Sequence, residues 1–295
     1  MQTHFTALMA AYAQEQGFSK KAAAVLADAS ADEGKYALAF EDTTCILSPY
    51  TDATGREYIL ASAHLEQIDM ALFDTAKEVT IAPTLARIFK NHDMLATPVP
   101  ILDPEQGLLG FAALRPLQLL SSQQFQDWLN SLEWLCLYAM KNDPLKHPTP
   151  QAAPVSVEAL TTLFSRAGFS LNGKNLFWRL ELGRPVLLFF RPDNGQAVLR
   201  SHITNIVPSD PKTMANALNL NTRLDFYAST LCDNDNLWFQ TTFYPQIMDA
   251  KDLLPVLQQH LDRCQTLAKI IAEDKKQPSR QMGTPLYDIT HSLRV

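Results

Sequence analysis

The sequence predicts an α+β protein made of two tandem α-β-β-β-α-β-β-α domains, each an antiparallel sheet with helices packed on it. Two observations support this. The chain has 295 residues, about twice the usual domain length, and the same order of apolar patterns occurs on both sides of a proline-rich segment. We expect a first domain at 1–142, a linker at 143–155, a second domain at 156–272 and a tail at 273–295. Accidental similarity of two α+β halves is the alternative to a duplication.

The linker is predicted from proline content. Four prolines lie between Asn142 and Pro154, and proline disfavours both helix propagation and pairing in a central strand. Such a segment is semi-rigid.

Each half is expected to open with an amphipathic helix. Residues 3–16 carry apolar side chains at helical spacing, and Gly17 can end the helix. The apolar residues are Phe5, Leu8, Met9 and Tyr12. In the second half, Ser156 can cap a matching helix that ends at Gly168.

Strand-like runs separated by turn residues follow in both halves. They are expected at 35–40, 44–49 and 57–65, and at 175–182, 185–191 and 196–207. A middle helix is then expected at 71–91 and, in shorter form, at 212–220. Two strands and a long helix close each half, at 95–102, 108–114 and 121–140, and at 222–231, 237–243 and 249–272.

The closing helices also share a spacing that supports duplication. One constant offset matches Phe125 with Leu254, Leu132 with Leu261, and Cys136 nearly with Cys264.

Composition excludes several classes of protein. The formal charge of -6 is spread along the chain without a basic block, which disfavours binding to nucleic acid. Apolar stretches are too short to span a bilayer, and the N-terminal residues lack the pattern of a signal peptide, so we expect a cytoplasmic protein without membrane insertion. The four cysteines form no C-x-x-C pair, and we expect them to be reduced and structural.

No catalytic or metal-binding pattern occurs in the sequence, so we expect neither an enzyme nor a cofactor. There is no H-E-x-x-H, nucleophile elbow, phosphate loop or G-x-G-x-x-G. His64 and His202 end corresponding strands, which indicates either a shared role or polar residues on a solvent face. The run 233–236 resembles a calcium loop but lacks its glycine and distal glutamate, which favours a hairpin turn. An enzyme with an unrecognised site is the third functional hypothesis.

Large apolar side chains on the face of a strand that is turned away from the core indicate a surface that binds a partner. In the strand at 175–182, Phe177 alternates away from the apolar side chains, and Trp238 does so in the strand at 237–243. The candidate partner-binding residues are Phe5, Leu8, Met9, Tyr12, Phe177, Trp178 and Trp238. They suit an extended segment that pairs with a sheet edge and places apolar anchors beside the first helix. Phe177 and Trp238 are equally suited to covering a contact between the domains.

In the tail, Leu286, Ile289 and Leu293 recur at helical spacing after a polar spacer. The hypothesis is that this segment docks on the protein's own surface or on a partner, and disorder is the alternative.

The order of elements and several runs resemble a known family. The runs are the first helix, Thr44 to Leu47, Tyr58 to Leu65, and Leu102 to Phe111 leading through Arg115-Pro116-Leu117 into the closing helix. In these the chain resembles the type III secretion chaperones, which implies a protein that holds a secreted effector or toxin ready for export. The YbjN-like proteins share a similar fold and imply instead an adaptor for a folded partner. Secretion chaperones are single domains that dimerise, so two copies in one chain imply a monomer that is an intramolecular pseudo-dimer.

Overall fold

The computed structural model describes residues 3–17, 19–21, 35–41, 43–52, 55–67, 99–103, 108–141, 148–171, 176–205, 221, 228–233 and 236–274. The chain forms two compact units, of which the first ends at Ala153, and the described residues from Pro154 onward belong to the second. No described helix is long and apolar enough to cross a membrane.

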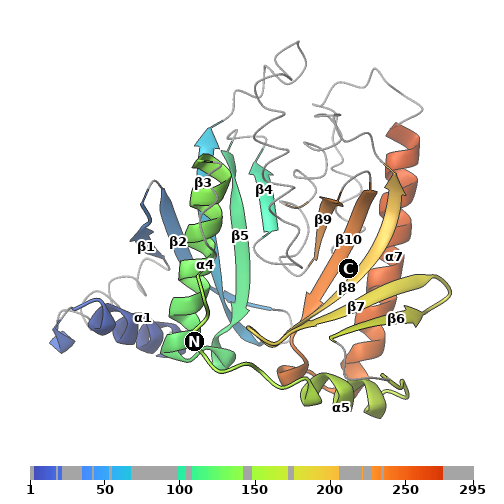
Figure 1. Cartoon of the computed structure of the whole chain (residues 1–295), viewed down its shortest axis with the longest axis horizontal. Coiled ribbons are helices and arrows are strands. Elements are labelled where there is room, and N and C mark those ends of the chain that lie inside the picture. Colours follow the sequence, from blue (N-terminus) through green and yellow to red (C-terminus); the bar gives the residue numbers. More distant parts are fainter. Residues whose placement is uncertain are drawn as a thin grey trace, which may run out of the picture. The chain divides into compact units, whose positions relative to one another are not determined.

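The first unit is a five-stranded sheet with helices against it (Figure 1). Its described elements are α1 (Thr3–Glu15), β1 (Tyr36–Ala39), β2 (Thr44–Thr51), β3 (Glu57–Gln67), β4 (Val99–Asp103), β5 (Leu108–Pro116), the 3-10 helix η2 (Leu117–Leu119) and α4 (Ser122–Lys141). The strand order is β1-β2-β3-β5-β4, and the sheet is antiparallel. Helix α4 packs against β3 and α1, which buries Phe5, Met9 and Phe125.

The second unit repeats this architecture. Its described elements are α5 (Glu158–Arg166), β6 (Phe177–Glu181), β7 (Pro185–Arg191), β8 (Gln196–Asn205), β9 (Ala228–Asp233), β10 (Asn236–Phe243), η3 (Pro245–Ile247) and α7 (Ala250–Asp274). The strand order is β6-β7-β8-β10-β9, which is the order of the first sheet. Helix α7 packs against β8, β10 and α5. The sequence-based fold class is thereby confirmed. The expected middle helices at 71–91 and 212–220 lie outside the described residues.

A β-bulge lies at the same place in both sheets. The pairing of β3 with β5 skips Leu65, the residue after His64. The pairing of β8 with β10 skips Ile203, the residue after His202. The prediction that the two histidines occupy corresponding strand ends is confirmed, and a shared irregularity of this kind supports duplication over accidental similarity.

The closing helices correct one prediction. Both follow a 3-10 helix, and counting from it aligns Phe125 with Leu253, Leu132 with His260, and Cys136 with Cys264; all six side chains are buried. The sequence-based match to Leu254 and Leu261 is wrong by one residue. Because one residue turns a helix by about 100°, that shift moves a side chain from the core to solvent, and Leu254 is 53% exposed.

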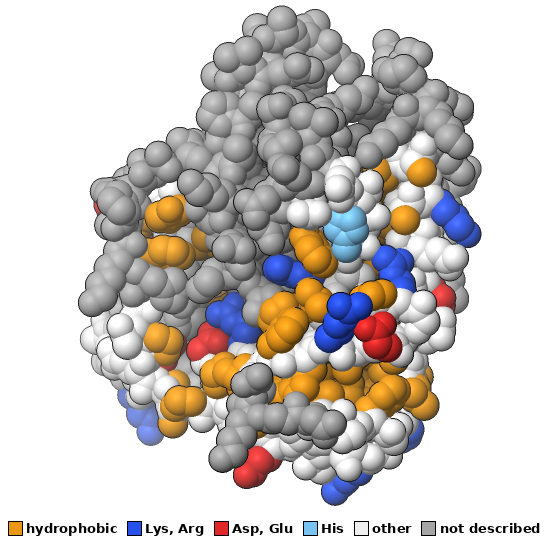
Figure 2. Space-filling view, turned by 45° about the vertical axis from the view of Figure 1, so that its right-hand side comes forward, with side chains coloured by type: hydrophobic (Ala, Val, Ile, Leu, Met, Phe, Trp, Pro, Cys, Tyr) orange, Lys and Arg blue, Asp and Glu red, His pale blue; other side chains and the backbone are white. Residues whose placement is uncertain are grey.

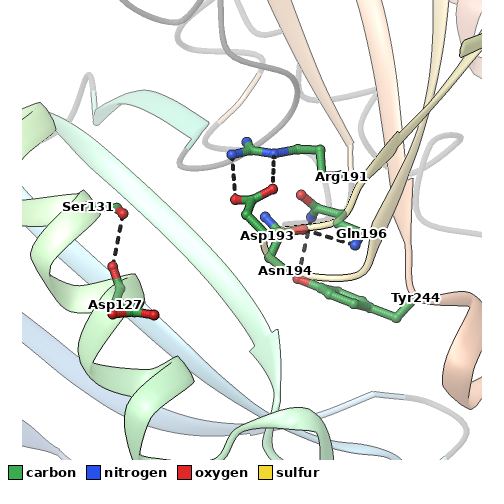
Figure 3. A network of polar contacts seen from close by, with 7 residues as sticks. All are labelled: Asp127, Ser131, Arg191, Asp193, Asn194, Gln196 and Tyr244. Atoms are coloured by element: carbon green, nitrogen blue, oxygen red, sulfur yellow. Dashed lines mark hydrogen bonds and ion pairs between the residues drawn. The ribbon is translucent and has the colours of Figure 1, made fainter. Parts of the chain in front are cut away.

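The β2–β3 and β7–β8 turns both place a glycine at positive φ. Gly55 has φ 81° and Gly195 has φ 69°, a region that L residues with a Cβ rarely occupy. In the second unit the turn is further fixed by side chains (Figure 3). Arg191 and Asp193 form an ion pair at 2.8 Å, and Asn194 Oδ1 accepts a hydrogen bond from the Gln196 N–H at 2.9 Å.

The described part of the linker is attached to the unit on each side of it. In the first unit, Asp127 Oδ2 on α4 accepts the N–H groups of Gln151 at 2.9 Å and Ala152 at 2.8 Å. In the second, the Val155 N–H donates to Pro192 O at 2.6 Å. Backbone donors near prolines therefore have partners although the segment forms no regular structure.

Candidate functional site: the outer face of the second sheet

The second sheet has an inner face toward its helices and an opposite face, here called the outer face. Alternation along β6 and β7 places Trp178, Leu180 and Leu188 in the core with residues of α5 and α7. Phe177 and Phe189 then belong to the outer face, where Phe177 is 45% exposed.

Five outer-face side chains form a continuous row across four strands, here called the cation–aromatic ladder: Phe177, Phe189, Arg200, Trp238 and His202. The rings of Phe177 and Phe189 are 4.8 Å apart. The Arg200 guanidinium lies 5.6 Å from the Phe189 ring and 5.7 Å from the Trp238 ring. His202 meets Trp238 edge to face at 5.3 Å. An arginine held between two aromatic faces is fixed in orientation as well as attracted to the rings.

Polar side chains lie beside the ladder. Arg200 pairs across the strands with Gln240, and Gln240 pairs with Ser229. Gln240 is 0% and Ser229 1% exposed, yet neither side chain has a hydrogen-bond partner within the part of the chain that is described. The same holds there for Trp238 Nε1 and His202 Nε2. Leaving a buried polar group unsatisfied costs about 1–3 kcal/mol.

The first unit shows that the fold does not require these residues. Counted from the shared bulge, the positions of Arg200, Gln240 and Trp238 are held in the first sheet by Ser62, Ala112 and Gly110. His64, at the position of His202, is exposed. The ladder and its polar neighbours are therefore a property of the second unit alone.

Figure 2 shows a surface on which hydrophobic side chains are interleaved with Lys and Arg side chains and a histidine. The exposed large hydrophobic residues of the described chain include Leu176 and Phe177, at the β6 end of the ladder. Exposed apolar side chains and buried polar side chains therefore lie next to one another on the outer face.

One edge of the second sheet is occupied by a side chain of the chain itself. Strand β9 is an edge strand, and Asn221 takes the place of a further strand beside it. Its Nδ2 donates to Thr230 O at 3.0 Å, and its Oδ1 accepts the Thr230 N–H at 2.6 Å. A partner strand adding to this edge would have to displace Asn221.

A buried histidine cluster lies on the inner face, and sequence reasoning gave no sign of it. His260 Nε2 is 2.9 Å from Ser201 Oγ, and its Nδ1 is 2.9 Å from Thr241 Oγ1. Burial is the main cause that lowers the pKa of His260 to about 3. A Ser–His pair is also a catalytic arrangement, but both residues are 1% exposed and the histidine bridges two hydroxyls between helix and sheet, which is a structural role.

The predicted partner-binding residues are placed differently by the structure. Phe5 and Met9 are fully buried, and Trp178 is 7% exposed, so these three belong to the cores. The helical pattern that selected them is the pattern of any core-facing helix.

The remaining predicted residues reach or approach the surface. Leu8 and Tyr12 are half-buried, and the Tyr12 ring packs edge to face on Phe125 at 5.3 Å. Phe177 and Trp238 lie together on the outer face with the ladder. The proposed docking residues Leu286, Ile289 and Leu293 lie outside the described residues.

Within the described ranges no group of three or more His, Cys, Asp or Glu side chains is arranged to hold a metal ion. Cys45, Cys136 and Cys264 are free and buried, and burial raises the pKa of the Cys45 thiol to about 12. Comparison with protein-family models, with curated proteins and with solved structures finds no match for this chain.

Proposed function

We propose that this protein is a non-catalytic binding protein that holds an extended segment of another protein along the outer face of its second sheet. The observation that carries the proposal is the cation–aromatic ladder with Gln240 beside it, whose side chain has no hydrogen-bond partner among the described residues. In the other copy of the fold, small residues stand at the positions of Arg200, Trp238 and Gln240. Because the ladder lies on the sheet face opposite the helices, this difference between the copies is not one of core packing.

The ladder suits an extended chain. Side chains on one face of such a segment recur about every 7 Å, so successive residues can contact Phe177 and Phe189 at one end and Trp238 at the other. The aromatic side chains of the ladder would supply binding free energy, and the polar side chains beside them would supply specificity. An unfolded segment loses conformational entropy on binding, so several such contacts are needed.

The class of partner follows from the resemblance given above. Likeness to type III secretion chaperones supports a secreted effector or toxin as the partner, a cytoplasmic protein, and a monomer in which the two units act as a pseudo-dimer. The formal charge of -6 argues against nucleic acid. The YbjN-like alternative differs in one respect, since its partner would be folded when bound.

The test is site-specific photo-crosslinking in cells from position 177, with the crosslinked peptide identified by mass spectrometry. The matched control carries the crosslinker at Lys35, the exposed residue just before β1, which corresponds to Phe177 because Tyr36 corresponds to Trp178 in the strand pairing. We expect position 177 to crosslink one segment repeatedly, and that segment to be protease-sensitive in the free partner and protected in the complex.

Equal crosslinking from both positions, or none from position 177, would contradict the proposal. A crosslinked segment that is already protease-resistant in the free partner would favour the folded-partner alternative.

A further inference from the structure

The edge of the second sheet that β6 forms is open among the described residues. Strand β6 lies at the end of the strand order opposite β9, and no described strand pairs with its outer side. The Phe190 N–H of β7 donates to Leu176 O at 2.9 Å, and hydrogen-bonded residues alternate along an antiparallel strand. The backbone N–H and C=O groups of every second residue of β6 therefore point away from β7. These residues are Phe177, Arg179 and Glu181.

Side chains at this edge are exposed on both faces of the sheet. Leu176 and Phe177, which lie on opposite faces because they are adjacent in the chain, are two of the three exposed large hydrophobic residues of the described chain. Arg179 and Glu181 are exposed on the outer face and form an ion pair at 2.7 Å. An exposed edge strand with apolar side chains is a template for pairing with another strand. The backbone and the side chains of β6 therefore both suit an added strand.

The corresponding edge of the first sheet carries different side chains. Strand pairing matches the three outward-directed residues of β6, in order, with Lys35, Ala37 and Ala39. Lysine on an edge strand hinders pairing with another strand, and the two alanines offer no charge to a partner. The exposed apolar and charged side chains of the β6 edge are thus not needed at the matched positions of the other copy.

We infer that part of the bound segment pairs with β6 as an added antiparallel strand, with an acidic residue opposite Arg179 and a basic residue opposite Glu181. The inference rests on the function proposed above, since the added strand belongs to the same bound segment. Antiparallel pairing is more stable than parallel pairing, and it reverses the order of the partner's residues. From its N-terminus the added strand therefore reads basic, apolar, acidic, apolar, apolar. Its last residue lies opposite Phe177, and its inner-face residues extend the second core past Trp178 and Leu180.

The charges at the edge favour this partner over other strands. Opposite charges directly across two strands stabilise their pairing, whereas like charges destabilise it. An exposed ion pair such as that of Arg179 with Glu181 contributes little to folding, so each of the two charges can also pair across the new strand. The other arginine nearby, Arg184, donates to His202 O of β8 at 2.6 Å and is thereby directed away from the open edge.

Two blocked peptides of equal composition test the charge pattern in NMR titrations of the full-length protein. The first is acetyl-Thr-Lys-Val-Glu-Val-Leu-Thr-amide, and in the second the lysine and the glutamate exchange places. We expect the first peptide to bind severalfold more tightly and to slow hydrogen exchange of the backbone amides of Phe177, Arg179 and Glu181. Arg179→Glu combined with Glu181→Arg should invert the preference. Equal affinity for the two peptides, tighter binding of the second, or unchanged exchange at the three amides would overturn the inference.

Backbone pairing is tested with methylated forms of the first peptide. In the inferred register the glutamate N–H faces Arg179 O, whereas the N–H of the valine before it faces away from β6. Methylation of the glutamate nitrogen should abolish binding, and methylation of that valine nitrogen should leave the affinity nearly unchanged. Equal losses from the two methylations would contradict strand pairing.

Proline variants separate this inference from the proposed function. Arg179→Pro removes an outward N–H without removing a bond to β7, and Ala37→Pro does the same on the first sheet, where it is the matched control. We expect only Arg179→Pro to reduce crosslinking from position 177. Should Arg179→Pro not fold, the methylated peptides decide.

The two failures look different. If position 177 crosslinks its segment equally in both proline variants, the strand inference fails while the binding function stands. If the peptides bind β6 as expected but position 177 captures no segment in cells, the proposed function fails and the edge remains a binding site.

Discussion

At the scale of single residues, His260 places a pair of buried side-chain hydrogen bonds in the core of the second unit. The imidazole joins α7 to two strands through Ser201 and Thr241 and stacks on Phe239 at 5.2 Å. The first unit fills the same three positions with Leu132, Ala63 and Ala113, all buried. At these three positions the first core is therefore packed with apolar side chains, and the second with hydrogen-bonded polar side chains.

This difference predicts a pH dependence. The pKa of His260 is lowered from 6.5 to about 3, so between these values the unfolded chain binds a proton that the folded protein does not. The contribution of neutral His260 to the free energy of unfolding of the second unit should therefore be fully present above pH 6.5. Below that pH the free energy of unfolding should fall by about 1.4 kcal/mol per pH unit, and the fall should level off near pH 3. Urea denaturation at pH 7 and pH 5 measures this.

The control uses the residues of the first unit. His260→Leu combined with Ser201→Ala and Thr241→Ala should remove this contribution, leaving a smaller difference between pH 7 and pH 5. His260→Leu alone leaves two buried hydroxyls without their partner, at a cost of about 1–3 kcal/mol each. An unchanged pH dependence in the triple variant would show that other groups cause it.

At the scale of elements, the matched turns at Gly55 and Gly195 separate two effects of adding a side chain. Both glycines have positive φ, so alanine is strained at either, by about 1 kcal/mol. At Gly55 an added Cβ meets nothing within 4 Å. At Gly195 it would overlap Gln246 Nε2 and lie 3.1 Å from Val155 Cγ1, and that amide donates to Gly195 O at 2.9 Å.

We therefore expect Gly195→Ala to lower the free energy of unfolding more than Gly55→Ala, by about 1 kcal/mol further for the lost hydrogen bond. Chemical denaturation of the two single variants measures the difference. Equal losses would mean that Gln246 moves aside without cost.

The elements themselves were largely predictable from local pattern. The strand Pro185–Arg191 has the predicted bounds, because alternating burial and turn residues on both sides define it. The one-residue error at Leu254 arose because Leu253 and Leu254 are equally apolar, and only the start of α7 decides which one faces the core. Sequence alone does not give that start, since helix ends depend on tertiary contacts.

The candidate site was predictable only in part. Alternation along the strands identified Phe177 and Trp238 as outward-facing, but it could not join them to Arg200, because their proximity depends on the register between strands far apart in the sequence. Phe5 and Met9 were selected by the same apolar pattern, and pattern does not distinguish a core from a binding surface. The counterpart of Gln240 also depends on register, because the offset taken from the sequence pairs it with Phe111, whereas strand pairing in the two sheets matches it with Ala112.

At the scale of the whole molecule, the repeat gives two cores that can be observed separately. The chain has four tryptophans. Trp128 and Trp134 lie on α4 in the first unit, and Trp178 and Trp238 lie on β6 and β10 in the second. Replacing either pair by phenylalanine leaves fluorescence that reports on one unit only.

We expect a lower pH to reduce the urea midpoint of unfolding more in one of these two variants than in the other. In the variant that keeps Trp178 and Trp238, the urea midpoint should fall from pH 7 to pH 5, because His260 belongs to the core of that unit. In the variant that keeps Trp128 and Trp134, the midpoint should fall less, because Leu132 replaces the histidine there. Midpoints that move together by the same amount would show that the two units unfold as one cooperative body, whereas separate movement shows that each core carries its own stability.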